Sequence, residues 1–147
     1  MNKTNSKSKQ EIEKELANFS GTTQYYRHSA ELFPLFFLTD GAYYAAESCG
    51  AYWLMDYIAS HQTNPVIRDH PKLQQLQFWE LKVKGSKGIV ICEWDSGFEV
   101  FREEIQFTDF PLDSIRIWVA PFYLGYAGYS DIQGKEWGWV AYLPSEH

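Results

Sequence analysis

Four side chains that could do chemistry follow one another along a single segment: Asp40, Tyr43, Tyr44 and Glu47. If the segment is a helix that begins at Thr39 or Asp40, intervals of three and four residues bring these side chains onto neighbouring turns. The first turn of a helix has free N–H groups and can bind an anion. Asp40 would repel that anion, and it has a structural role as a cap. We therefore favour a structural role, and keep the four as candidate ligand-binding residues.

His61 could form a general acid–base pair with Asp56, because imidazole and carboxyl groups both transfer protons. His70 is close in sequence, but no nucleophile lies at a telling spacing, and a solvated helix edge is the simpler explanation. His61 stays a candidate ligand-binding residue. A metal site built from the histidines and Asp69 is not expected, because no ligand pair, His28 included, has the i, i+4 spacing of a helix.

A second candidate surface is aromatic, and it lies in and just after residues 121–136. A segment longer than about 12–15 residues without regular structure is uncommon and often functional. Exposed aromatic rings beside glycines could stack on a ligand or anchor a partner. Alternatively, the segment folds back and covers the sheet, and both interpretations stay open. The candidate partner-binding residues are Tyr123, Tyr126, Tyr129, Trp137 and Trp139.

Motifs of common enzymes and cofactor sites do not occur in the sequence: there is no P-loop, dinucleotide glycine fingerprint, G-x-S-x-G, H-E-x-x-H or CxxC. We therefore expect no cofactor, and we lean against an enzyme. Cys49 and Cys92 both lie within apolar runs, which predicts buried thiols in a reducing compartment.

The element that must position the first candidates is Phe36–Gln62, FFLTDGAYYAAESCGAYWLMDYIASHQ. We expect a capped helix, or two helices that meet at Gly50. The segment has almost no polar face, which is typical of a helix buried on several sides. A shorter helix is predicted from Ser8 to Phe19, with Glu11 as the capping-box partner of Ser8.

From Gln77 the hydrophobic period changes to two, which indicates strands. Short strands separated by turns at residues 85–88 and 95–97 predict an antiparallel meander of roughly five strands. The expected fold is α+β, with the N-terminal helices packed on one face of this sheet. At 147 residues we expect a single domain over residues 1–147. Its parts are a polar tail (1–7), a mainly helical half (8–76) and an antiparallel sheet half (77–147).

Composition excludes several classes of partner. The formal net charge is −6 and no basic stripe occurs, so we expect no binding to nucleic acid or to an anionic membrane surface. The same acidity argues against a protein that stacks single-stranded nucleic acid on its rings. The polar N-terminus lacks the apolar core of a signal peptide, and no apolar run reaches 18 residues, so we expect a cytoplasmic protein.

Four stretches resemble the motifs of an uncharacterised bacterial domain family: LTDGAYYAAE (38–47), AYWLMDYIASHQ (51–62), FTDFPLDSI (107–115) and LPSE (143–146). That family has the pattern TDGAYYLAE…AYWLLD…ASYQ, then FPLD and a terminal LPSE, and the resemblance covers the chain from about residue 20. It implies no activity and no catalytic residue. Members occur in bacterial and mobile-element contexts, which implies a cytoplasmic accessory role. Relatives join the last two strands by a short turn, so a function of residues 121–136 would be particular to this branch.

Two hypotheses follow. The first is a small non-catalytic cytoplasmic interaction protein of bacterial or mobile-element origin, as a homodimer or with another protein partner. The second is a small-ligand-binding protein or enzyme, with a pocket between the 36–62 segment and the sheet. The aromatic content of 18% and the missing catalytic motifs favour the first.

Overall fold

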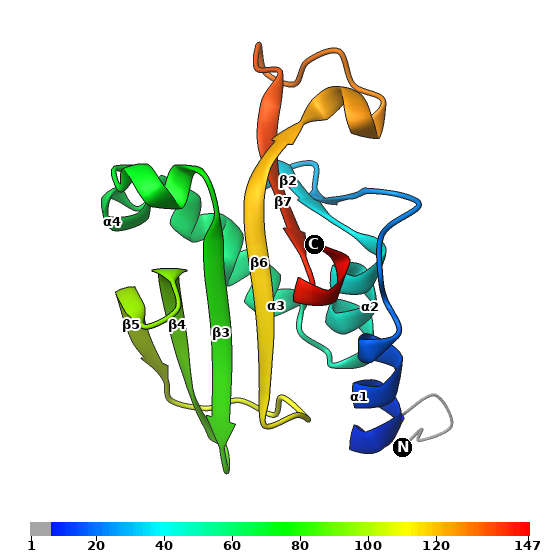
Figure 1. The fold of residues 1–147 in the computed structure, drawn as a ribbon, viewed down its shortest axis with the longest axis vertical. Helices are drawn as coiled ribbons and strands as arrows, with labels where there is room; N and C mark the ends of the chain where they lie inside the picture. Colours follow the sequence, from blue (N-terminus) through cyan, green and yellow to red (C-terminus); the bar gives the residue numbers. More distant parts are fainter. Residues whose placement is uncertain (1–6) are drawn as a thin grey trace.

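The computed structural model describes residues 7–147, so all of the predicted polar tail except Lys7 lies outside the described residues. The fold is α+β, with a seven-stranded mixed sheet in the order β1-β2-β7-β6-β3-β4-β5 (Figure 1). The strands are β1 (Tyr26–Ser29), β2 (Phe33–Leu38), β3 (Gln77–Lys84), β4 (Lys87–Asp95), β5 (Phe98–Ile105), β6 (Ser114–Tyr123) and β7 (Trp137–Tyr142). The α-helices are α1 (Lys9–Ala17), α2 (Asp40–Ser48), α3 (Tyr52–Ser60) and α4 (Pro65–Arg68). Four 3₁₀ turns complete the described chain: η1 (His61–Thr63), η2 (Pro71–Gln74), η3 (Leu124–Ala127) and η4 (Pro144–Glu146).

The sheet differs from the predicted five-stranded meander in strand number and in order. The five predicted strands are present as β3–β7, but the half expected to be mainly helical also contributes β1 and β2. β2 pairs with β7 in parallel, so the sheet is mixed. β6 pairs with β3 rather than with β5, because residues 106–113 carry the chain back across the sheet. A period of two predicts that a strand exists, but it does not predict which strand lies beside it.

The segment with almost no polar face forms two helices, which was one of the two predicted forms. Thr39 caps α2 through its side chain, which accepts a hydrogen bond from the Ala42 N–H. Gly50 separates α2 from α3 with φ +60, a left-handed conformation that favours glycine. α2 and α3 bury Ala42, Ala45, Ala46, Leu54, Met55 and Ile58 against the sheet. The N-terminal helix is also as predicted, with a capping box between Ser8 and Glu11.

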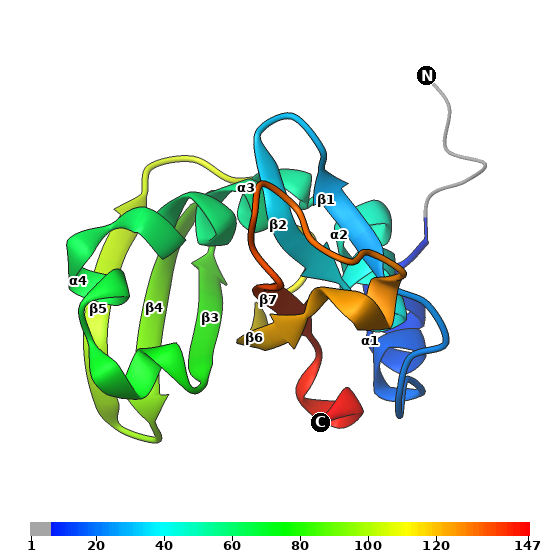
Figure 2. The ribbon, with the colours of Figure 1, turned by 90° about the horizontal axis from the view of Figure 1, so that it is seen from above.

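Hydrophobic side chains pack on both faces of the sheet. The larger core lies between the sheet and the helices, and Trp79 of β3 is its largest fully buried side chain. A smaller core lies on the opposite, outer face under residues 124–136 and includes Phe37, Phe122, Leu124, Ile132, Val140 and Tyr142. Figure 2 shows η4 and α3 on opposite sides of β6 and β7. Within residues 7–147, no helix has the length and apolarity needed to cross a membrane.

Candidate functional site

The carboxylate of Asp40 joins the chain before β1 to the first turn of α2. It accepts hydrogen bonds from the Thr23 N–H (2.8 Å), the Thr23 hydroxyl (2.9 Å) and the Tyr26 hydroxyl (3.1 Å). Burial alone would raise the pKa of this carboxyl, but the hydrogen bonds outweigh it and hold the pKa below its ordinary value. The Tyr26 ring stacks on Tyr43 with a centroid separation of 4.4 Å. Asp40 and Tyr43 therefore hold the scaffold together.

The N-terminus of α2, which could have bound an anion, is closed by the chain's own Glu146. One carboxylate oxygen accepts a hydrogen bond from the Gly41 N–H at 3.0 Å. The other accepts hydrogen bonds from the Thr39 hydroxyl at 2.7 Å and the Leu143 N–H at 2.9 Å. An added Cβ at Gly41 would lie 2.5 Å from this carboxylate, so glycine permits the close approach. A negative side chain at a helix N-terminus is favourable, and here it takes the place of an external anion.

The two other candidates on α2 also bond within the chain. Glu47 accepts a hydrogen bond of 2.6 Å from the Tyr52 hydroxyl, and burial together with this bond raises the pKa of Tyr52. The Tyr44 hydroxyl donates to Glu15 on α1. The first two turns of α2 therefore form a packed network of hydrogen bonds.

The candidate acid–base residues bond to other partners and not to each other. Nδ1 of His61 lies 2.8 Å from the Tyr57 carbonyl oxygen, and its ring packs on Phe101 at 4.8 Å. Asp56 instead bonds Nε2 of His28 at 2.6 Å, and the side chain of His28 is only 4% exposed. The sequence showed no sign of this pair, because β1, which carries His28, was not predicted.

Metal and thiol chemistry find little support in the geometry. In the part of the chain that the structure describes, no three His, Cys, Asp or Glu residues gather as potential metal ligands. Both cysteines are buried. Burial raises the pKa of Cys49 to about 11 and also raises that of Cys92. A thiol that stays protonated is a poor nucleophile.

The aromatic segment after β6 divides into a packed part and an exposed part. Tyr129 packs edge-on against Phe37 at 5.9 Å, and Arg27 lies 5.0 Å from the centroid of its ring. Tyr126 and Trp137 are 71% and 57% exposed. The two remaining candidate residues follow the same division: Tyr123 contacts both exposed rings, and Trp139 packs against the larger core. Ile132, within the segment, is also buried. Part of residues 121–136 thus covers the sheet and part is exposed, and partner binding by the exposed rings stays a prediction.

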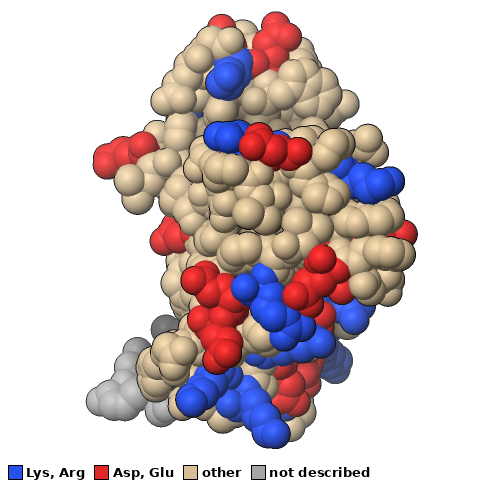
Figure 3. Space-filling model, turned by 90° about the vertical axis from the view of Figure 1, so that its left-hand side faces the viewer, with Lys and Arg blue, Asp and Glu red and all other residues tan. Residues whose placement is uncertain are grey.

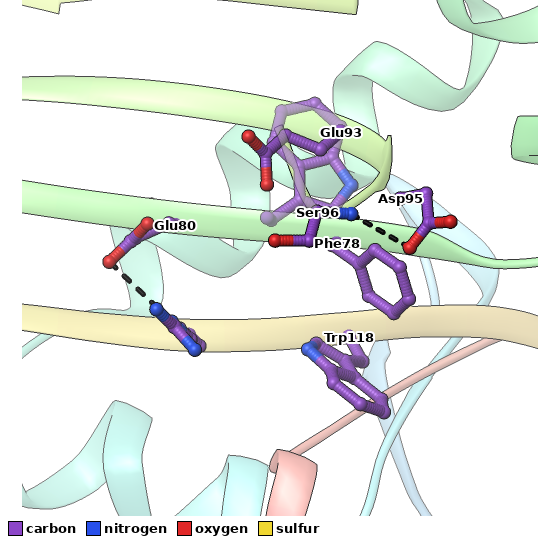
Figure 4. A pocket seen from close by; sticks show the side chains of 8 residues that line it. Phe78, Glu80, Glu93, Asp95, Ser96 and Trp118 are labelled. Atoms are coloured by element: carbon purple, nitrogen blue, oxygen red, sulfur yellow. Dashed lines mark hydrogen bonds and ion pairs between the residues drawn. The ribbon is translucent and has the colours of Figure 1, made fainter. Parts of the chain in front are cut away.

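A groove that sequence analysis missed lies on the outer face of β3, β4 and β6, with a volume of about 280 Å³ (Figure 4). Strand register builds it: Phe78 on β3 pairs with Trp118 on β6 and with Glu93 on β4. The Phe78 and Trp118 rings are 4.6 Å apart. The β4–β5 turn at Asp95–Ser96 borders one end of the groove.

The groove is acidic and only partly neutralised. Arg116 lies 3.6 Å from the Glu80 carboxylate. Asp95 accepts a hydrogen bond from the Ser96 N–H at 2.8 Å. The residue Glu93 is half-buried, and its side chain has neither a hydrogen bond nor an ion pair to any residue from 7 to 147. Carboxylates beside aromatic faces suit an organic cation such as a lysine or arginine side chain. Finding this site needs the register of three strands, which a single sequence does not supply.

The fold and these contacts define a small α+β protein whose helix-borne polar residues maintain the scaffold and whose sheet carries an acidic, aromatic groove. Residues 10–147 match the model of a family of unknown function, DUF6876, and the chain belongs to this family. The predicted relationship to an uncharacterised family is thereby confirmed. Comparison with curated proteins and with solved structures found no match.

Proposed function

We propose that this protein is a small non-catalytic interaction protein that binds a positively charged segment of a partner protein in the outer-face groove. The observation that carries the proposal is Glu93, a half-buried residue whose carboxylate has no hydrogen bond or ion pair in the described chain, next to the Phe78–Trp118 pair. A carboxylate without a partner in its own chain can pair with an opposite charge from a bound molecule. A bound cation would supply that charge and would also contact the rings, a contact worth about 0.5–2 kcal/mol.

Size and charge support a protein segment over a lone ion. A volume of about 280 Å³ accommodates a long basic side chain together with part of its backbone. The rings give this segment apolar contact area, which a small inorganic cation would not use. The formal charge of −6 attracts basic partners over a longer range. The family context and the absence of enzyme motifs support a cytoplasmic accessory role in a bacterium or a mobile element.

The alternative of a small-ligand site between the helices and the sheet has one observation in its favour. A second hollow, of about 220 Å³, lies between the end of α3 and β2, and Phe36, Ala59 and Trp139 are among its lining residues. Its most buried polar contributor, Gln62, is already bonded to the Gln77 amide at 2.9 and 2.8 Å. The groove offers an unused charge and this hollow does not, so the groove is the better candidate.

A binding titration tests the proposal directly. A fluorescein-labelled peptide of alternating lysine and glycine should raise its anisotropy on binding, and the same peptide with glutamate for lysine should not. Glu93→Gln keeps the shape of the side chain and removes its charge, so we expect about tenfold weaker binding, as for loss of a charged hydrogen-bond partner. The matched control is Glu136→Gln, because Glu136 is exposed and lies outside the groove. Equal affinities for the two variants would refute the proposed site.

A further inference from the structure

The outward side chains of β3 and β4 change from acidic and aromatic at one end to basic at the other. Along β3 the outward residues are Phe78, Glu80, Lys82 and Lys84. Along β4 the residues beside them are Glu93, Ile91, Ile89 and Lys87. Lys82, Lys84 and Lys87 have no ion pair within the described residues 7–147. The groove therefore lies at one end of this face, and the basic β3–β4 turn lies at the other.

This arrangement is complementary to itself. Consider two copies placed outer face to outer face, with a two-fold axis that runs across the strands between Glu80 and Lys82. The axis reverses the strand direction but keeps each strand opposite its own copy, so Glu80 faces the second copy's Lys82. On β4 the same axis places Ile91 opposite Ile89, and it places Glu93 opposite Lys87. Every facing pair on β4 is then either apolar or of opposite charge.

Side chains on β5 are also complementary in charge across this axis. Arg102 pairs with Ile91 in register, and Glu104 pairs with Ile89, so both lie on the outer face. The axis places Arg102 of one copy opposite Glu104 of the other. Arg102 also bonds its own Glu99 at 2.8 Å, so in a dimer it would lie between two carboxylates. Figure 3, which views the molecule from the side on which β5 forms the edge of the sheet, shows acidic and basic side chains side by side over the lower part.

We propose that the occupant of the groove is the β3–β4 turn, residues 84–87, of a second copy of this chain, in a reciprocal two-fold dimer. This inference rests on the proposed function, because it requires that the groove bind cations. Closed two-fold symmetry uses both grooves and both turns. Lys87 would neutralise Glu93, and Lys84 would reach the Phe78 ring. The partner class is therefore the protein itself.

Charge-swap variants test this arrangement by sedimentation velocity. The unaltered chain should show a concentration-dependent dimer that weakens as salt screens its ion pairs. Lys87→Glu and Glu93→Lys should each weaken dimerisation at least about tenfold, because each puts like charges together at two symmetric contacts. A mixture of the two variants should dimerise again, because glutamate then faces lysine at both contacts. Lys14→Glu makes the same charge change on α1, which packs on the opposite side of the sheet, and should leave the dimer intact.

The outcomes separate this inference from the proposed function. If the chain stays monomeric at every concentration but binds the lysine peptide through Glu93, the dimer is refuted and the proposed cation site is supported. A dimer that is insensitive to Lys87→Glu, or a mixture that does not recover, also overturns it. Loss of both dimerisation and peptide binding in Glu93→Lys, with recovery of the dimer on mixing, supports it. Far-ultraviolet circular dichroism of each variant checks that it is folded.

Discussion

Replacing Glu146 by alanine should lower the stability of the whole protein, although this residue lies in the last turn of the described chain. Its carboxylate accepts hydrogen bonds from the Gly41 N–H, the Thr39 hydroxyl and the Leu143 N–H. A hydrogen bond to a charged group contributes about 1.5–3 kcal/mol when buried, and nearer 1 kcal/mol where water can replace it. Glu146 is half-buried. We therefore expect a loss of about 3 kcal/mol, or about 6–12 °C in Tm for a chain of this size.

The contact with Gly41 makes a second, coupled measurement possible. An added Cβ at Gly41 would lie 2.5 Å from the Glu146 carboxylate oxygen and 2.7 Å from Leu143 Cδ1. Gly41→Ala should therefore displace Glu146 and cost about 1–3 kcal/mol, as overpacking does. When Glu146 is already alanine, the closer of these two clashes is absent. The loss in the double variant should then be clearly smaller than the sum of the losses in the two single variants.

Urea unfolding of the four chains, followed by tryptophan fluorescence, gives the free energies of unfolding for this cycle. Glu136→Ala is the matched control, because it removes an exposed glutamate from outside this contact and should change stability by less than about 0.5 kcal/mol. If Glu146→Ala changes the free energy of unfolding as little as this control does, the contact of Glu146 with the N-terminus of α2 is not important for stability. If the two losses add within about 0.5 kcal/mol, Glu146 and Gly41 do not interact.

Two further predictions concern the residues first chosen from the sequence. Because the folded pKa of Asp40 lies below its ordinary value, its ionised form stabilises the fold above that ordinary value, and this contribution is lost as the pH falls through the folded pKa. Asp40→Asn should therefore cost about 1–2 kcal/mol near neutral pH and progressively less in acid, measured by thermal melts across the acid range; a loss that is independent of pH would contradict this. Tyr129→Ser should destabilise by about 2 kcal/mol because the ring packs on Phe37, whereas Tyr126→Ser, at a ring that is 71% exposed, should stay within about 0.5 kcal/mol. Equal unfolding midpoints for these two variants would show that residues 124–136 do not cover the sheet.

The elements that could be predicted from the sequence are those with a strong local signal. Alternating side chains predicted β3 through β7. The capping residue Thr39 and the break at Gly50 predicted α2 and α3. β1 and β2 carried no such signal. β2 is Phe33–Leu38, FPLFFL, an unbroken apolar run that lies between β1 and β7 in the sheet. A buried strand of this kind has no polar alternation, so a period-two search does not find it.

Candidate sites were harder to predict, because a site depends on which strands and loops become neighbours. Polar side chains on α2 invited a ligand-binding interpretation, yet the partners of Asp40 and Glu146 lie 17 and 105 residues away in the sequence. The groove, in contrast, was not predicted from the sequence. Phe78 and Glu93 lie on separate strands, and only the register of β3 and β4 places them side by side. A hydrogen-bond partner or a binding surface of this kind follows from topology, which local patterns do not contain.

The four motif stretches and the groove lead to different expectations for relatives of this chain. The stretch at 38–47 and the stretch at 143–146 meet where Glu146 closes α2. The stretch at 107–115 buries Phe110 and Leu112, and the stretch at 51–62 buries Leu54 and Met55. All four thus contribute to the scaffold, whereas the eight residues that line the groove, from Phe78 to Trp118, belong to none of them. A relative with these motifs should therefore share the fold, but it should bind a cation in this way only if it also has an aromatic pair and a free carboxylate on the outer face.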